Sequence, residues 1–139
     1  MTHDLTAVTQ ACIDYIRDVG GVSFAELERI LERHGVPAKG SYVVEFPTMP
    51  NMLLWMGMSE EFVDIVQALD KHPDVDWKPT STLVYIADGR CPMAPLAKRP
   101  RKGGYKEPHW LPVAFNWTKP RTQQERLDSA RRALKAGTP

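Results

Sequence analysis

Residues 52–69 restrict the possible folds more than any other part of the chain. They begin with an apolar segment typical of a strand, pass through a glycine turn at Gly57 and continue as a helix with a clear start. Ser59 stands at the N-cap position, where a serine oxygen accepts a hydrogen bond from a free amide of the first turn. Glu60 and Glu61 follow, where the helix dipole favours negative charge. The stretch therefore predicts a strand–turn–helix unit.

The helix predicted over residues 59–71 has one apolar face, because large apolar residues recur there at the spacing i, i+3, i+4, i+7. These residues are Phe62, Ile65, Val66 and Leu69. Met58 and Val63 occupy the two positions of a hydrophobic staple, which fixes the entry of the chain into the helix. We expect the earlier and later segments to cover this apolar face.

Two further helices are predicted before it, over residues 4–19 and 23–34. The first has an apolar stripe and a glycine just beyond its end, and either Asp4 or Thr2 can cap it. Its stripe consists of Leu5, Val8, Cys12, Ile16 and Val19. The second opens with Ser23-Phe-Ala-Glu26, the spacing of a capping box. Val22, between the two helices, can add one short strand pairing.

Strand patterns predict two hairpins. Residues 42–46 alternate in polarity, and 52–56 form a second apolar strand after a turn cluster at 47–51. Residues 81–87 are rich in β-forming side chains, and Asp88-Gly89 is a favoured hairpin turn. The return strand is predicted over 91–97, at a sheet edge because its prolines cannot donate to a ladder.

The C-terminal part is basic. A loop over residues 98–108 is rich in cations and glycine, and we expect it to be mobile when free. Its candidate binding residues are Lys98, Arg99, Arg101, Lys102, Tyr105 and Lys106. The aromatic segment 109–117 is predicted to return to the sheet. A helix beginning with the capping box Thr122-Gln-Gln-Glu125 carries further bases, among them Arg131 and Arg132.

Charge is segregated along the chain. Residues 1–76 hold 13 acids and 5 bases, a net charge of −8, whereas residues 77–139 hold 13 bases and 4 acids, a net charge of +9. Such segregation indicates an anionic partner for the basic part. The alternative is that the two parts attract each other within the fold.

Other classes of protein are less compatible with the sequence. The 139 residues suit one domain. No apolar run approaches the roughly 20 residues of a membrane helix, and the N-terminus lacks a signal-peptide pattern, so we expect a cytoplasmic protein. Neither the cysteines nor the histidines have the spacing of a metal site, and no diagnostic catalytic motif is present. We therefore expect no cofactor, no metal and no enzymatic activity.

Three helices followed by a two-stranded hairpin is an element order that resembles the winged helix-turn-helix proteins, common among small DNA-binding regulators of bacteria and phages. The resemblance covers residues 4–97. It implies an α+β fold with a three-helix core and a β-hairpin wing tipped by Asp88, Gly89 and Arg90. Residues 1–117 would form this domain, with an insertion at 36–58 and the basic loop, and residues 118–139 would form a basic helix or tail.

The resemblance implies a regulator, plausibly encoded by a phage or other mobile element, that binds double-stranded DNA. The third helix presents Glu60, Glu61 and Asp64 outward, and these carboxylates would repel phosphates. We therefore assign DNA binding to Arg90, the basic loop and the tail helix. The alternative is a protein-interaction module, an adaptor or anti-repressor, whose acidic third-helix face meets a basic partner.

Overall fold

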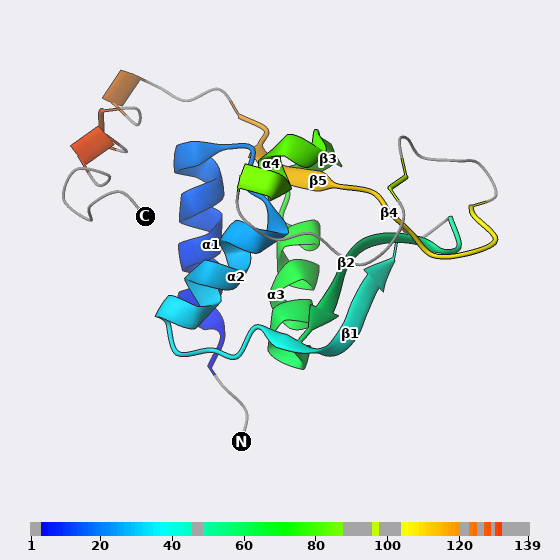
Figure 1. Ribbon diagram of the computed structural model, residues 1–139. Helices are drawn as coiled ribbons and strands as arrows, with labels where there is room; N and C mark the ends of the chain where they lie inside the picture. The colour runs from blue at the N-terminus through cyan, green and yellow to red at the C-terminus, as the bar shows by residue number, and fades with distance from the viewer. Residues whose placement is uncertain are drawn as a thin grey trace.

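The computed structural model describes residues 4–45, 49–87, 96–97 and 104–119, together with 123–124, 127–128 and 130–131; of residues 86 and 87 it describes the backbone only. Within these ranges the chain is an α+β fold of four helices and two small sheets (Figure 1). No helix among them has the length and apolar character needed to cross a membrane.

The three predicted core helices are confirmed as α1 (Thr6–Val19), α2 (Phe24–Arg33) and α3 (Glu60–Lys71). Serine caps start the last two. Ser23 Oγ accepts the Glu26 N–H at 3.1 Å, and Ser59 Oγ accepts the Phe62 N–H at 3.0 Å. At α1 the Asp4 carboxylate accepts the Thr6 N–H at 3.0 Å, and this bond lowers the pKa of Asp4.

The predicted first hairpin is also confirmed. Strand β1 (Lys39–Glu45) pairs antiparallel with β2 (Met52–Met58), which runs through Gly57 to the start of α3. The short strand β4 (His109–Trp110) pairs parallel with β2 and gives the order β1-β2-β4. The aromatic segment 109–117 thus returns to this sheet through β4, whereas β5 (Val113–Trp117), which follows, belongs to a second sheet.

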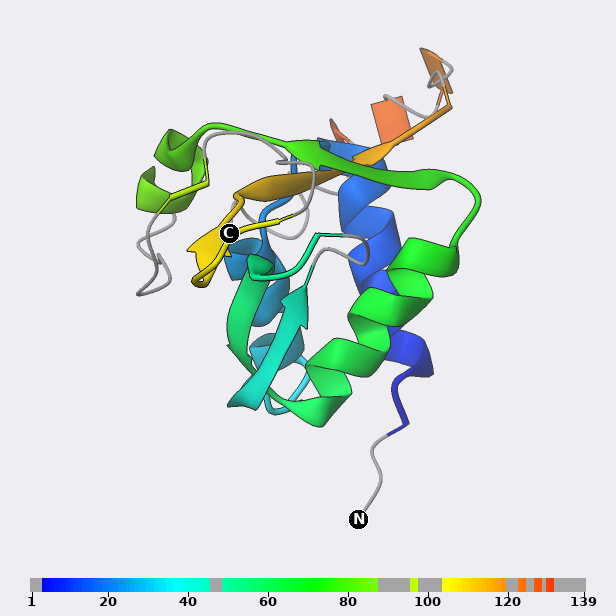
Figure 2. The ribbon, with the colours of Figure 1, turned by 90° about the vertical axis from the view of Figure 1, so that its right-hand side faces the viewer.

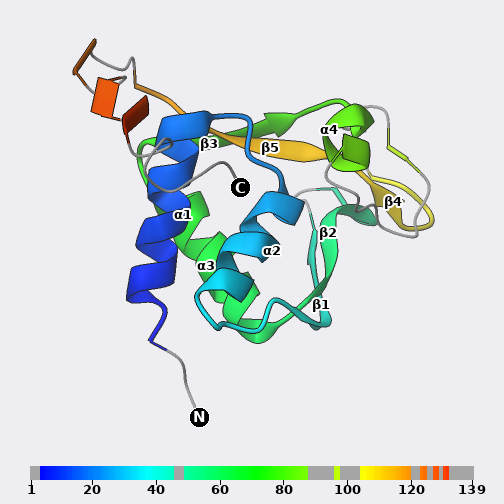
Figure 3. The ribbon, with the colours of Figure 1, turned by 60° about the vertical axis from the view of Figure 1, so that its left-hand side comes forward.

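A second sheet pairs β5 with β3 (Val75–Pro79) in antiparallel register from Val75↔Trp117 to Pro79↔Val113. This two-stranded sheet lies across one end of the helices (Figure 3). Val22 joins it through two backbone bonds with Phe115, of 3.0 and 2.8 Å, so the short pairing expected at Val22 is confirmed.

The wing was predicted wrongly. Residues 81–87 do not form a strand, because α4 (Thr82–Ala87) occupies this stretch. The helix buries the whole side chain of Tyr85, whose hydroxyl donates to the Val113 carbonyl at 2.5 Å and accepts the Phe24 N–H at 3.2 Å. Tertiary burial here overrides the β-propensity of the sequence.

The remainder of the predicted wing lies mostly outside the described residues, which include neither the Asp88-Gly89 turn nor residues 91–95. At its far end, Leu96 forms a parallel bridge with Trp110, and the Ala97 N–H donates to the Trp110 carbonyl at 2.7 Å. Of the predicted tail helix, the six described residues within 123–131 are helical.

An aromatic cluster forms the centre of the core. Phe24 stacks on Trp55 with ring centroids 5.7 Å apart, and its ring also contacts Phe62 and Phe115, at 6.1 and 5.3 Å. Trp55 donates its indole N–H to the buried carboxylate of Glu28 at 3.1 Å. The predicted apolar face of α3 is confirmed, because all four of its large side chains are buried.

Replacing Phe62 with alanine is expected to lower the free energy of unfolding by about 3–5 kcal/mol, since it removes a fully buried aromatic ring. Replacing the neighbouring, half-exposed Glu61 with alanine is expected to cost only about 0.3 kcal/mol, the loss of a favourable charge in the first turn. Urea denaturation of both variants measures the difference. Equal losses would contradict the assignment of the buried face.

Candidate functional site

A recess lies between α3 and β1. The two elements start close together, where the Ser59 N–H donates to the Ala38 carbonyl at 2.9 Å, and they diverge from there (Figure 2). We call it the α3–β1 recess; its volume is about 270 Å³. Its lining comes from α2, β1, β2, α3, β3 and β5: Phe24, Val43, Val44, Glu45, Leu54, Val63, Val66, Gln67, Asp70, Trp77 and Phe115. Four consecutive elements, β1 to β3, together with α2 and β5 therefore build one site.

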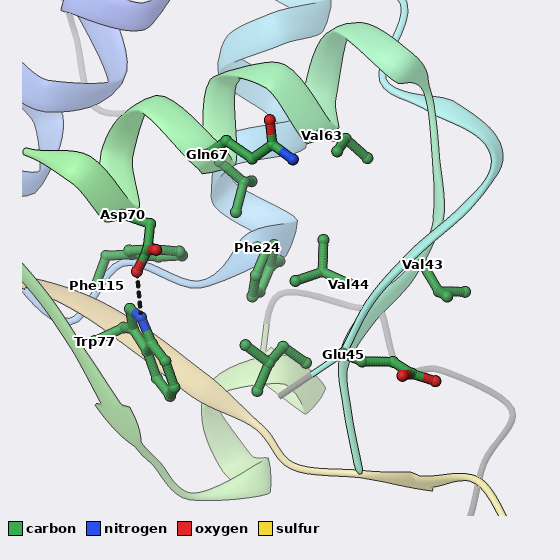
Figure 4. A pocket seen from close by; sticks show the side chains of 11 residues that line it. Phe24, Val43, Val44, Glu45, Val63, Gln67, Asp70, Trp77 and Phe115 are labelled. Atoms are coloured by element: carbon green, nitrogen blue, oxygen red, sulfur yellow. Dashed lines mark hydrogen bonds between the residues drawn. The ribbon is translucent and has the colours of Figure 1, made fainter. Parts of the chain in front are cut away.

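The floor of the recess is part of the hydrophobic core. Phe24, Leu54 and Phe115 are each at most 5% exposed. Figure 4 shows the rings of Phe24 and Phe115 beneath α3. Val63 and Trp77, both half-buried, form the side walls. An apolar guest is favoured, because it would remove the exposed parts of these two wall side chains from water.

The rim of the recess is acidic. Asp70 extends from α3 and Glu45 from β1, and both are exposed (Figure 4). The Asp70 carboxylate accepts the indole N–H of Trp77 at 3.1 Å, which holds the Trp77 ring at the edge of the recess. Gln67, one turn before Asp70 on α3, adds an exposed amide to the lining. The arrangement suits a guest that is apolar at its tip and cationic or hydrogen-bonding beside it.

The cysteine and histidine side chains are absent from this lining, as are serine and threonine hydroxyls. Within the described part of the chain, no group of three or more histidine, cysteine or acidic side chains is placed to hold a metal ion. The polar side chains that line the α3–β1 recess are two carboxylates, an amide and an indole.

The predicted acidic face lies on the same helix as one wall of the recess. Glu60 and Asp64 are exposed and Glu61 is half-exposed, all in the first half of α3. Asp70 is in the second half. The helix thus carries carboxylates from its start to the recess, and Lys71 is the only base within its bounds.

Most of the predicted DNA-binding residues lie outside the described part of the chain: Arg90, Lys98, Arg99, Arg101, Lys102 and Arg132. Tyr105 is half-buried, and Lys106 and Arg131 are exposed. Of these three described residues, only Tyr105 and Lys106 lie together, at the C-terminal end of the basic loop. Arg131 contacts Asp128 at 3.9 Å within the tail.

The hairpin turn fixes the base of the basic loop. The Asn51 side-chain amide donates to the carbonyls of Tyr105 and Lys106, at 3.0 and 3.1 Å, and the Tyr105 N–H donates to the Pro50 carbonyl at 2.9 Å. The Tyr105 ring stacks on His109 with centroids 4.1 Å apart. Gly104 has φ +75°, and a Cβ there would collide with Pro50. The turn at 50–51 therefore sets where the loop ends.

Sequence reasoning missed the α3–β1 recess. The hydrogen bond between Trp77 and Asp70 could have been predicted, because the two residues flank a short segment and a buried indole N–H usually finds an acceptor. The alternation of Val75 and Trp77 with Asp76 and Lys78 was also a signal for strand β3. The contribution of Phe24 and Phe115 depends on long-range packing, and no local pattern indicates it.

Comparison of the chain with protein-family models, curated proteins and solved structures finds no match.

The burial of Cys12 predicts a specific pH dependence. Desolvation raises the pKa of this fully buried thiol to about 12, from an ordinary value of 9.0. In the unfolded chain the Cys12 thiol loses its proton near its ordinary pKa, whereas in the folded chain it keeps the proton up to a higher pH. The protonated thiol therefore contributes its full share of folding stability below pH 9, and this share is lost as the pH rises towards 12. The expected slope is at most about 1.4 kcal/mol per pH unit.

The measurement compares urea denaturation of the wild type and the Cys12→Ala variant across this pH range. Lysine and tyrosine side chains titrate in both proteins, so the difference in slope isolates the thiol. The variant is expected to lose less stability per pH unit. Parallel curves would show that Cys12 is not desolvated in the fold.

Proposed function

We propose that this chain is a protein-interaction module that binds a basic partner segment through the acidic side of α3. The observation that carries the proposal is the α3–β1 recess, an apolar cavity with Glu45 and Asp70 on its rim. One large apolar side chain of the partner enters the recess. Lysine or arginine residues beside it meet the rim carboxylates.

The size of the recess supports a side-chain anchor. Sites for drug-sized small molecules have volumes of about 300–1,000 Å³. The α3–β1 recess, at about 270 Å³, lies just below that range. Protein interfaces concentrate their binding energy in a few apolar or aromatic anchors that fill such pockets, surrounded by a polar rim.

The charge of the chain supports a basic partner. The recess belongs to the acidic part, residues 1–76, with its net charge of −8. Glu60, Glu61 and Asp64 add further negative charge to α3, at exposed or half-exposed positions. Complementary charge accelerates association and selects among partners more than it adds affinity. The module is thus expected to bind faster at low salt.

A variant that blocks the recess tests the proposal. Peptides are first selected from a random display library against the wild-type protein, and the enriched ones are expected to carry a large apolar residue beside lysine or arginine. Gln67→Trp then places an indole over the opening from an exposed position. It is expected to weaken binding at least tenfold, about 1.4 kcal/mol, in fluorescence-polarisation titrations.

Ala68→Trp is the matched control, because Ala68 is the next residue of α3, is exposed and does not line the recess. Its affinity is expected to stay within twofold of wild type. Selection of acidic peptides, or equal binding by both tryptophan variants, would rule out the recess as the binding site.

A second candidate is the DNA-binding regulator expected from the basic part of the sequence. The observation that favours it is the fixed base of the basic loop, where Asn51 holds the backbone of Tyr105 and Lys106 beside an exposed lysine side chain. The half-buried Tyr105 can contact a sugar or phosphate. DNA binding would then use the basic part of the chain, whereas the interaction module uses the acidic part.

Salt dependence distinguishes the two candidates. The test variant carries alanine in place of Lys98, Arg99, Arg101, Lys102 and Lys106. If all five contact phosphates, the slope of log K against log salt for duplex DNA is expected to change by about 4.5. Alanine at Glu60, Glu61 and Asp64 is expected to leave DNA binding unchanged or stronger.

The interaction module predicts the reverse pattern: the loop variant keeps its peptide and the acidic-face variant binds it more weakly. Wild-type protein that shows no salt-dependent association with any duplex would eliminate the DNA-binding candidate.

A further inference from the structure

The outer edge of β1 lies beside the α3–β1 recess and has no strand partner among the described residues. In the sheet order β1-β2-β4, β1 is the terminal strand, and within the described chain its backbone bonds go to β2. An unpaired edge presents a row of free N–H and C=O groups on which another strand can pair.

The side chains of β1 are unusually exposed for a strand. Six of its seven residues are exposed, among them Tyr42 at 52% and Val43 at 48%. Natural proteins usually keep apolar side chains off a free edge, because such edges attract other chains. Large apolar side chains on β1 indicate a surface that a partner covers.

The pairing of β1 with β2 is irregular. Lys39 and Tyr42 both face Met58, and the register shifts again before Val44 and Glu45. Irregularities of this kind bend a strand and increase its twist. Figure 2 shows β1 diverging from α3 towards its C-terminal end, which is where the recess opens. The free edge and the cavity therefore meet.

Three consecutive residues, Val43 to Glu45, belong both to the edge strand and to the lining of the recess. Side chains of a strand point alternately to opposite faces. A strand added at this edge would therefore direct every second side chain towards the recess side, and one of them can fill the cavity. Backbone pairing supplies affinity in such complexes and the pocket supplies specificity.

We propose that the partner segment binds in extended conformation, as an added strand on the free edge of β1, with one apolar side chain in the α3–β1 recess. This inference rests on the proposed interaction function and names the form of its ligand. The charge beside the recess selects the segment: Asp70 on α3 lies at the recess, and the exposed Glu45 lies on β1 next to Val44, so lysine or arginine residues flank the anchor.

The test uses a designed probe, a short amidated peptide in which lysines alternate with valines around a central leucine. Amide hydrogen exchange of the full chain is followed by NMR with and without the peptide. Amides within residues 41–45 are expected to exchange at least tenfold more slowly with the peptide bound. Amides of the α1 helix serve as the internal reference.

N-methylation of the peptide backbone, one residue at a time, gives a second readout. An added strand donates through alternate N–H groups only. Methyl groups are therefore expected to abolish binding at every second position and to be tolerated between them. A bound helix would instead lose affinity at successive positions and would leave β1 exchange unchanged.

The outcomes separate the two proposals. Slower exchange in β1 together with loss of binding in Gln67→Trp supports both. Binding that is sensitive to Gln67→Trp but leaves β1 exchange unchanged overturns the added strand and keeps the recess. Slower β1 exchange that Gln67→Trp does not affect overturns the recess as the anchor site. No slower exchange at any peptide concentration up to the solubility limit overturns the added strand.

Discussion

The ring of Phe24 is the contact on which the rest of the fold depends. It touches Trp55 of β2, Phe62 of α3 and Phe115 of β5, so one side chain at the start of α2 joins both sheets and the third helix. Its backbone N–H donates to the Tyr85 hydroxyl and thereby includes α4. Aromatic rings at these separations contribute beyond their buried area, and their preferred angles restrict how the elements can be arranged.

The sequence was sufficient where the determining interactions are local. Ser23 and Ser59 lie within three residues of the amides that they cap, and both helix starts were predicted correctly. The sequence was insufficient where a contact with a residue far along the chain determines the local structure. Tyr85 has the composition of a strand around it but lies in a helix, because its hydroxyl is satisfied by Val113 and Phe24.

The same distinction explains the candidate sites. The acidic face of α3 follows from helix periodicity, and the structure leaves it exposed. The α3–β1 recess requires six elements to meet, so no single segment encodes it. The basic loop was easy to recognise by composition, yet the residue that fixes its end, Asn51, lies about 50 positions earlier and becomes relevant only through the fold.

The floor of the α3–β1 recess has a thermodynamic consequence. Phe24 is at once the central ring of the core and part of the lining of the recess. Occupancy of the recess and folding are therefore linked: a guest that binds only the folded chain shifts the folding equilibrium by mass action. The melting temperature would then depend on guest concentration, so the protein's lifetime in a cell would follow the abundance of its partner.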